Sequence, residues 1–209
     1  LPVATQVANF HRKSGIMSDN PAYRYRGGPD VTEVNQKIQM LWVGGDLTPF
    51  ERLSITSWLK HGFAVDLYTY GEVNGAPEGC ILRDASEIMS KEQIFAHSSQ
   101  TGRSEGSFAG FADIFRWHLL RQRGGFWSDT DIVCLRPFKL PRNLAISSEI
   151  ARTFGADHMA ITNCFYGGPA GHPIFEAARA HITSYDPETL NWGEVGTQLI
   201  GQLVDELDL

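Results

Sequence analysis

A strand, a helix and a second strand follow one another in the first half of the chain, and this order constrains the fold more than any other feature. Ile38–Val43 is a mostly apolar segment that ends at a pair of glycines. Thr48, Pro49 and Glu51 then mark a helix start, because threonine can cap, proline suits the first helical position and glutamate completes a capping box. A glycine ends the helix, and the apolar segment Ala64–Tyr70 follows. Such a unit requires parallel strands joined by a right-handed crossover, so we expect an α/β fold with a mostly parallel central sheet covered by helices.

Two helices of this fold have apolar residues at helical spacing. The first is expected to bury Phe50, Leu53, Ile55, Trp58 and Leu59. The second is expected to begin at Ser107 and to run to about Arg123, where two glycines stop it. The apolar face of the second helix consists of Phe111, Ile114, Phe115, His118 and Leu119.

The length of 209 residues suits a single domain. Residues 1–35 show no periodicity and are interpreted as an N-terminal extension, which leaves residues 36–209 as the domain. The extension holds basic side chains that either contact an anionic surface or are simply solvated: His11, Arg12, Lys13, Arg24 and Arg26.

Charge and composition exclude several classes of protein. A net charge of −6 argues against a nucleic-acid binder, which needs clustered positive charge. No uncharged run is apolar enough for a transmembrane helix. The cysteines, Cys80, Cys134 and Cys164, are too few and too widely spaced for a disulfide framework and suit a reducing compartment. We therefore expect a cytoplasmic protein; peripheral membrane contact, secretion as an effector and a Golgi-lumenal location stay open.

Asp129 and Asp131 are the most informative residues, because they interrupt an apolar strand pattern between Phe126–Ser128 and Ile132–Leu135. Residues two apart share one face of an extended strand, and neighbouring carboxylates repel each other. A positive partner is therefore expected beside them. A divalent cation satisfies both, and carboxylate oxygens favour Mg²⁺ or Mn²⁺. The alternative is a solvated turn between two short strands.

Asp113 and Arg116 form a second polar pair, in the helix that leads into this strand. They are three residues apart and share a helix face, which differs from the face of Ile114 and Phe115. They form either a local ion pair or, because their helix runs directly into the acidic strand, part of the same cleft.

These stretches together resemble a known family. Residues 111–116 (Phe-Ala-Asp-Ile-Phe-Arg) and 124–131 (Gly-Gly-Phe-Trp-Ser-Asp-Thr-Asp) resemble the DXD region of sugar-nucleotide glycosyltransferases of the GT-A fold. The resemblance is greatest to the DXD sugar-binding-region family, which includes yeast initiating mannosyltransferases, capsular polysaccharide enzymes and, more distantly, the large clostridial glucosylating toxins. Residues 41–45 (Leu-Trp-Val-Gly-Gly) resemble the first strand of that family, and residues 161–168 match more weakly. The resemblance implies a single Rossmann-like nucleotide-diphospho-sugar transferase domain.

The resemblance also implies roles for individual residues in donor binding. Trp42 matches a tryptophan that stacks on the donor base, although by itself it would be interpreted as a core residue. Asp113 and Arg116 match the pair that contacts the donor sugar hydroxyls and the diphosphate side. Trp127 is expected near the ribose, and Asn163 near the donor sugar.

The metal ligands follow from the same resemblance. Asp129 matches the first DXD aspartate, which faces the ribose and a metal-bound water, and Asp131 matches the direct ligand of Mn²⁺ or Mg²⁺. Asp113, Arg116 and Asp131 are therefore the expected catalytic residues. No convincing nucleophile or base accompanies them, because the histidines stand alone.

The implied function is metal-dependent transfer of a hexose-type sugar from a nucleoside diphosphate sugar, with uridine favoured, to a glycan, glycolipid or protein acceptor, with retention. Polysaccharide biosynthesis is one setting for such a reaction. Two alternatives stay open: an inactive domain of this fold that binds nucleotide, glycan or protein, and a haloacid-dehalogenase-type phosphatase. The match fades past Thr183, where Gly193–Thr197 stands in for a Thr-Gly-Pro segment, and the end at Leu209 is interpreted as a C-terminal truncation.

Overall fold

The computed structural model describes residues 37–97, 105–153 and 156–209. The expected N-terminal extension lies outside these residues. The six strands form one sheet, in the order β3-β2-β1-β4-β6-β5. Their bounds are β1 Lys37–Trp42, β2 Ala64–Thr69, β3 Cys80–Asp84, β4 Gly125–Ser128, β5 Ala145–Thr153 and β6 Ala156–Gly168. Strands β1 to β4 pair in parallel, whereas β6 is antiparallel to both β4 and β5. The predicted α/β fold with a mostly parallel sheet is thereby confirmed.

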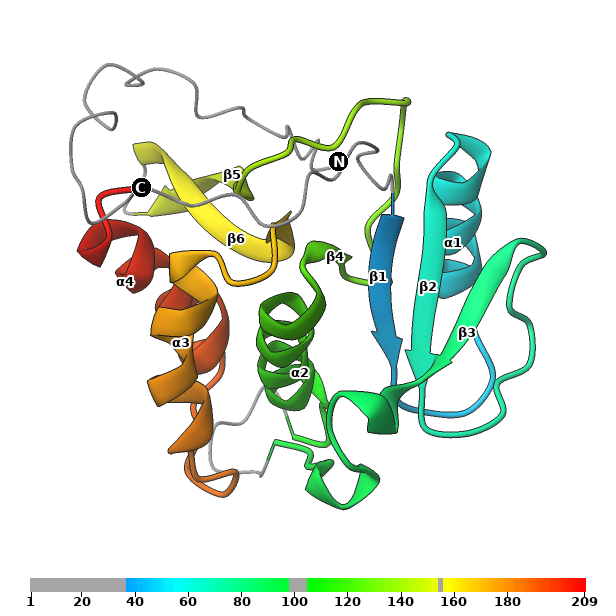
Figure 1. Ribbon diagram of the computed structural model, residues 1–209, viewed down its shortest axis with the longest axis horizontal. Helices are drawn as coiled ribbons and strands as arrows, with labels where there is room; N and C mark the ends of the chain where they lie inside the picture. The colour runs from blue at the N-terminus through cyan, green and yellow to red at the C-terminus, as the bar shows by residue number, and fades with distance from the viewer. Residues whose placement is uncertain (1–36, 98–104, 154–155) are drawn as a thin grey trace.

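Helices cover both faces of this sheet (Figure 1). The α-helices are α1 Pro49–Lys60, α2 Ala109–Arg123, α3 Pro173–Thr183 and α4 Leu199–Glu206. Short helical turns lie at Ala85–Glu87, Lys91–Gln93 and Glu194–Gln198. On one face, α1 packs on a core that includes Ile38, Phe126 and Phe165. On the other face, α2, α3 and α4 enclose a second core around Trp117 and Trp127.

Helix α1 begins as the sequence predicts, but it buries a different face. The Thr48 hydroxyl accepts a hydrogen bond from the Phe50 amide, and the capping box with Glu51 is complete. Ile55 and Trp58 are buried as expected. Phe50 and Leu53, however, are 75% and 55% exposed, so the predicted stripe is wrong at its N-terminal end.

The reason lies in two serines of α1 and the segment that follows β4. The Ser54 hydroxyl donates to the Ile132 carbonyl, and the Ser57 hydroxyl accepts from the Cys134 amide at 2.8 Å. These serines therefore turn inward and satisfy the backbone of an irregular segment. Residues 132–135 are not a strand, which corrects the prediction, because their polar groups bond to a helix instead of a sheet.

Helix α2 is buried on almost every side. Phe111, Ile114, Phe115 and Leu119 of the predicted apolar face are fully buried, and His118 of that face is half-buried. The helix ends at Gly124, whose φ is 62° and whose Cα approaches the backbone of Ala170 so closely that a side chain would collide with it. This glycine lets α2 turn directly into β4.

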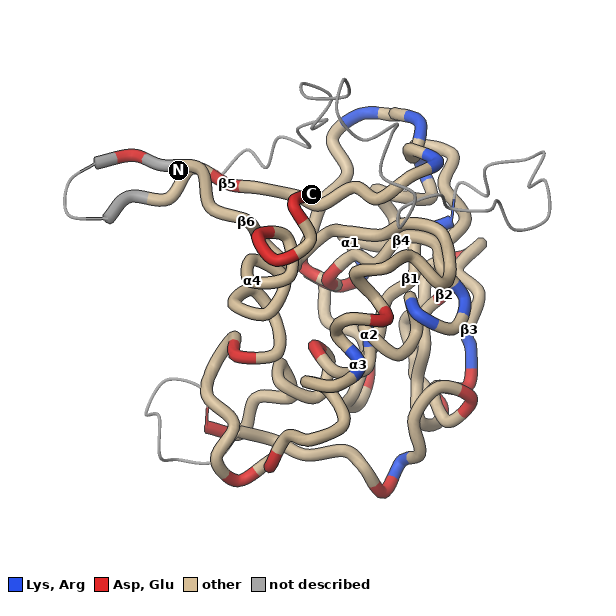
Figure 2. Tube along the Cα trace, turned by 60° about the vertical axis from the view of Figure 1, so that its left-hand side comes forward, with Lys and Arg blue, Asp and Glu red and all other residues tan. Residues whose placement is uncertain are grey.

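Basic residues are distributed unevenly over the fold (Figure 2). Asp and Glu are spread over the whole fold, whereas few Lys and Arg lie around α3 and α4. Residues 173–209 contain seven Asp and Glu but one Arg, Arg179. Within the three described ranges, no helix is long and apolar enough to cross a membrane.

Candidate functional site

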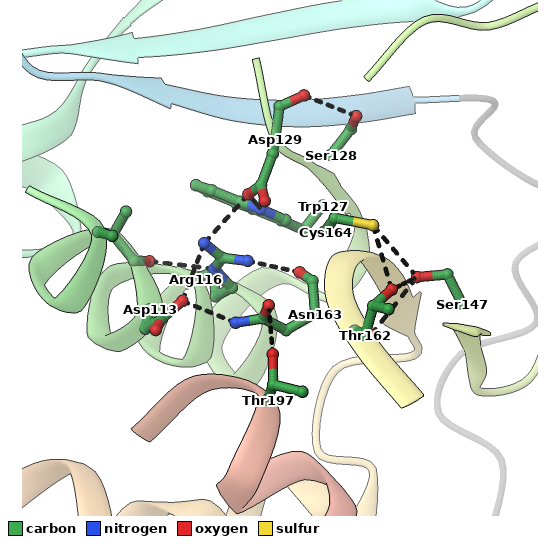
Figure 3. Close-up of polar contacts among 12 residues, drawn as sticks. Asp113, Arg116, Trp127, Ser128, Asp129, Ser147, Thr162, Asn163, Cys164 and Thr197 are labelled. Atoms are coloured by element: carbon green, nitrogen blue, oxygen red, sulfur yellow. Dashed lines mark hydrogen bonds and ion pairs between the residues drawn. The ribbon is translucent and has the colours of Figure 1, made fainter. Parts of the chain in front are cut away.

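Polar side chains converge where β4 ends, between α2, β6 and the turn Glu194–Gln198 (Figure 3). The chain arrives there because α2 leads through two glycines into β4. Residue 129 follows the carboxyl end of β4, and Trp42 is the last residue of the parallel neighbour β1. Open α/β sheets bind ligands at the carboxyl ends of their parallel strands, so this edge is the expected place for a site.

Arg116 lies at the centre of this cluster, with a side chain that is 5% exposed. Its Nη2 lies 3.0 Å from Oδ1 of Asp113 and 3.0 Å from Oδ1 of Asp129. Its Nη1 donates to the Asn163 carbonyl. The guanidinium carbon also lies 4.7 Å from the centre of the Trp127 ring, within the range of a cation–π contact. The arginine thus links α2, β4 and β6.

Asp129 is held from two further sides. Its backbone amide donates to the Cys164 carbonyl at 2.8 Å, which extends the pairing of β4 with β6 by one residue. The Trp127 indole Nε1 donates to Asp129 Oδ1 at 2.7 Å. The Asp129 side chain remains 29% exposed, so it can still face a ligand.

Asp113 is bound to β6 and to the turn before α4. The Asn163 amide donates to Asp113 Oδ1 at 2.7 Å, and the Thr197 hydroxyl donates to Asn163 Oδ1 at 3.0 Å. Gly196 packs directly against Asp113 and Asn163, so that a Cβ at position 196 would collide with Asp113 Oδ2 and the Asn163 amide nitrogen. A glycine is therefore required where the turn crosses the site.

The cluster carries an excess of negative charge, since two carboxylates share one guanidinium. Burial raises the pKa of Asp113 to about 6, against the opposing attraction of Arg116. Burial likewise raises the pKa of Asp129, and the nearby Asp131 adds to that rise. A site of this charge favours ligands that bring hydroxyl donors or a cation.

A cavity of about 100 Å³ opens beside this cluster. Its lining consists of Ala109, Asp113, Arg116, Asp129, Asn163, Trp192, Gly193 and Thr197. Among the described residues, the ionisable groups of this lining are Asp113, Arg116 and Asp129.

Of the residues predicted to bind the donor, the structure brings Asp113, Arg116, Trp127, Asp129 and Asn163 together. Two other predicted site residues lie apart from the cavity. Trp42 is half-buried at the end of β1, where its indole Nε1 donates to the Gly45 carbonyl at 2.7 Å and its ring packs against the core on the α1 face. Asp131 is exposed in the turn after β4.

Asp129 and Asp131 are the carboxylates that could hold a metal ion. They lie near enough for the charge of Asp131 to raise the pKa of Asp129. Among the residues that the structure describes, no cluster of three His, Cys, Asp or Glu forms a complete ligand set. Mg²⁺ and similar cations commonly take one or two carboxylates and fill the remaining positions with water and substrate phosphates, so this pair fits such an ion.

Sequence reasoning did not assign Trp192 and Thr197 to the site. Both belong to the polar segment before α4, and their place in the cavity depends on how that segment packs across α2. A tryptophan in an otherwise polar, glycine-containing stretch (Asn191-Trp192-Gly193) is the one local signal that could have pointed to it.

The fold is shared with the solved structures of a glycosyltransferase and of a transferase. The PaToxG glycosyltransferase aligns with a TM-score of 0.56 over 83% of this chain and 69% of its own, at 16% sequence identity. A transferase that carries two cysteine-to-serine substitutions aligns with a TM-score of 0.51 over 83% of this chain and 86% of its own, at 10% identity. No family model and no curated protein matches the sequence. At these identities the likeness establishes the predicted glycosyltransferase fold.

Proposed function

We propose that the protein is a metal-dependent glycosyltransferase that transfers a hexose-type sugar from a nucleoside diphosphate sugar. One observation carries this proposal: on a fold shared with glycosyltransferases, Arg116 is fixed between Asp113 and Asp129 beside a small polar cavity. Carboxylate, amide and hydroxyl groups that converge on a cavity of this kind suit the hydroxyls of a sugar.

Different residues would bind different parts of the donor. Asp113 and Asn163 face the cavity and would accept and donate hydrogen bonds to the sugar hydroxyls. Trp127 would border the ribose, and Trp42, at the same edge of the sheet, would stack on the base, with uridine favoured. Arg116 orients both carboxylates and adds positive charge on the diphosphate side.

Asp129 and Asp131 would hold Mn²⁺ or Mg²⁺. When bound, the ion supplies neutralisation of the negative charge on the departing nucleoside diphosphate, which is the main catalytic assistance expected. Asp131 is exposed in the turn after β4, where it can meet the diphosphate from solvent. The sequence resemblance favours retention of configuration.

The acceptor would be a glycan, a glycolipid or a protein side chain, and a cytoplasmic location with peripheral membrane contact fits each of these. A second candidate function is an inactive domain that binds nucleotide or glycan, favoured by the extent to which protein groups already occupy Arg116. The phosphatase alternative is disfavoured, because its aspartate motif follows the first strand of its domain, whereas Asp129 follows β4.

The test is release of nucleoside diphosphate from UDP-glucose, UDP-galactose, UDP-N-acetylglucosamine and GDP-mannose, with Mn²⁺ and with chelator. A transferase releases UDP or GDP slowly to water, or faster with an acceptor, and chelation stops the release. A binding module shows ligand-dependent stabilisation, about 2.7 kcal/mol at 100 times the dissociation constant, without release. If the protein neither binds any of these donors nor releases a nucleoside diphosphate from them, both functions are contradicted.

A further inference from the structure

Residues 191–198 form one wall of the cavity, and none of them is among the residues predicted to bind the donor. Trp192, Gly193 and Thr197 of this segment line the cavity together with Asp113 and Asn163. The cavity therefore has a charged, hydrogen-bonding side and a side that presents an aromatic ring and a hydroxyl.

The 191–198 segment is attached firmly to the rest of the fold. The Trp117 indole in α2 donates to the Val195 carbonyl at 2.7 Å, a buried hydrogen bond between residues 78 positions apart. Thr197 donates to Asn163 of β6 at 3.0 Å, and Gly196 packs against the same asparagine. A wall held by both α2 and β6 keeps its shape, which is what discrimination between similar ligands requires.

Trp192 is 56% exposed although it is one of the largest apolar side chains of the protein. Its inner side packs against the buried His97, with ring centroids 5.6 Å apart. The rest of the indole is left uncovered at the cavity. An aromatic ring in the same cavity as hydrogen-bonding groups suits a pyranose, whose hydroxyls project at the rim while its C–H groups form an apolar face that can pack on the ring.

The size of the cavity also selects one part of the donor. About 100 Å³ is well below the roughly 300–1,000 Å³ of sites that enclose drug-sized ligands, so it can hold a single sugar ring rather than a whole nucleotide sugar. Trp42, proposed for the base, and Asp131, one of the two carboxylates proposed for the metal, lie outside the cavity lining, whereas Asp129, the other carboxylate, belongs to it. The nucleoside would then lie outside the cavity, toward Trp42, and the diphosphate would lie beside Asp129 at the cavity.

We infer that Trp192 and Thr197 determine which sugar the enzyme transfers: Trp192 packs on the apolar face of the donor hexose, and Thr197 positions Asn163 and borders one of its hydroxyls. The inference rests on the proposed function, because it concerns the sugar end of the same donor site. It assigns to the 191–198 segment a specificity-determining role that leaves recognition of the nucleotide to other residues.

The experiment compares binding of a nucleotide sugar with binding of its free nucleoside diphosphate. Calorimetry with UDP-glucose, UDP-galactose, UDP-N-acetylglucosamine and GDP-mannose, each with Mn²⁺, first identifies the sugar that wild type prefers. Trp192→Ala and Thr197→Val are then expected to weaken binding of that nucleotide sugar by about tenfold or more, which is about 1.4 kcal/mol, and to leave the Kd for UDP or GDP within about twofold.

Two further variants make the comparison decisive. Trp192→Phe keeps an aromatic face and should recover most of the affinity for the nucleotide sugar. Phe50→Ala removes an aromatic ring that is even more exposed, 75% against 56% for Trp192, from α1 on the other face of the sheet, and should change neither affinity.

Equal weakening of nucleotide sugar and free diphosphate in Trp192→Ala, or no weakening of either, would overturn the inference while the proposed function stands. If wild type binds neither the nucleotide sugars nor the free nucleoside diphosphates, the proposed function itself is overturned, and the inference with it. A thermal unfolding midpoint close to that of wild type shows that a variant is folded, so that its loss of affinity does not come from unfolding.

Discussion

Arg116 pairs with Asp129 at 3.0 Å although the arginine side chain is 5% exposed, and the same Nη2 lies equally close to Asp113. One buried guanidinium therefore balances two carboxylates that come from different elements, α2 and the end of β4. The arrangement keeps both acids in place and leaves the cluster with net negative charge, ready for a cation or for hydroxyl donors.

Removing this guanidinium should be costly for stability. Arg116→Met leaves the buried Asp113 and the partly buried Asp129 without their charged partner, and losing one member of a buried pair typically costs about 3–5 kcal/mol. Urea unfolding measures the change. Arg121→Met, which breaks the more exposed contact with Glu176 at 3.5 Å, serves as the control and should cost about 1 kcal/mol or less. A similar small loss in both variants would show that Arg116 is not a structural centre.

Asp131→Asn should abolish metal-dependent release of nucleoside diphosphate while the protein stays folded. The substitution removes one of two carboxylates proposed for the metal, and a fall on the order of 100-fold is expected. Because Asp131 is exposed, the substitution should change the unfolding free energy of the protein by about 0.5 kcal/mol or less. Asp205→Asn, at an exposed position on α4, is the matched control. Normal turnover by Asp131→Asn would refute its assignment as a metal ligand.

Trp42→Ala should weaken binding of the nucleotide. Stacking of an aromatic ring on a base contributes about 1–3 kcal/mol, so the Kd for UDP should rise by roughly 5- to 150-fold. Calorimetry with UDP and Mn²⁺ measures it, and Trp42→Phe should retain much of the affinity. If affinity stays the same and the unfolding free energy falls instead, Trp42 is a core residue, in line with its contact with the α1-side core.

Features encoded by neighbouring residues could be predicted from the sequence. The capping box at Thr48 needs two residues three positions apart, and it forms as expected. The failures involve partners far along the chain. Phe50 and Leu53 are exposed because Ser54 and Ser57 turn inward to bond residues 132–134, and local periodicity cannot reveal that partner.

In the candidate site, too, local pairs could be predicted from the sequence and long-range contacts could not. Asp113 and Arg116 could be paired from their spacing, and the helix that leads into β4 placed them near Asp129. Trp192 could not be placed, because its position depends on the bond between Trp117 and Val195, across 78 residues. Long-range packing of an irregular segment leaves no periodic signal in the sequence.

Gly196→Ala should disturb the candidate site, although Gly196 is not one of its polar residues. The added Cβ would collide with Asp113 and the Asn163 amide, so the turn must shift and the unfolding free energy should fall by about 1–3 kcal/mol. Nucleoside diphosphate release should fall as well. The control is Gly201→Ala in α4, where a Cβ meets no atom within 4 Å and helix propensity should stabilise by up to about 1 kcal/mol. Equal effects of the two substitutions would contradict the close approach.

The pH dependence of stability should reveal the buried state of Asp113. Burial raises the pKa of this carboxyl from 3.8 to about 6, so between these values the folded state binds more protons than the unfolded state. The unfolding free energy must then decrease as pH rises from about 4 to about 6, by up to about 3 kcal/mol for this group. Comparing wild type with Asp113→Asn by urea unfolding across pH 4–7 isolates that contribution, with Asp205→Asn as the control. A difference that grows in favour of wild type as pH rises would mean that attraction by Arg116 outweighs burial and holds Asp113 ionised.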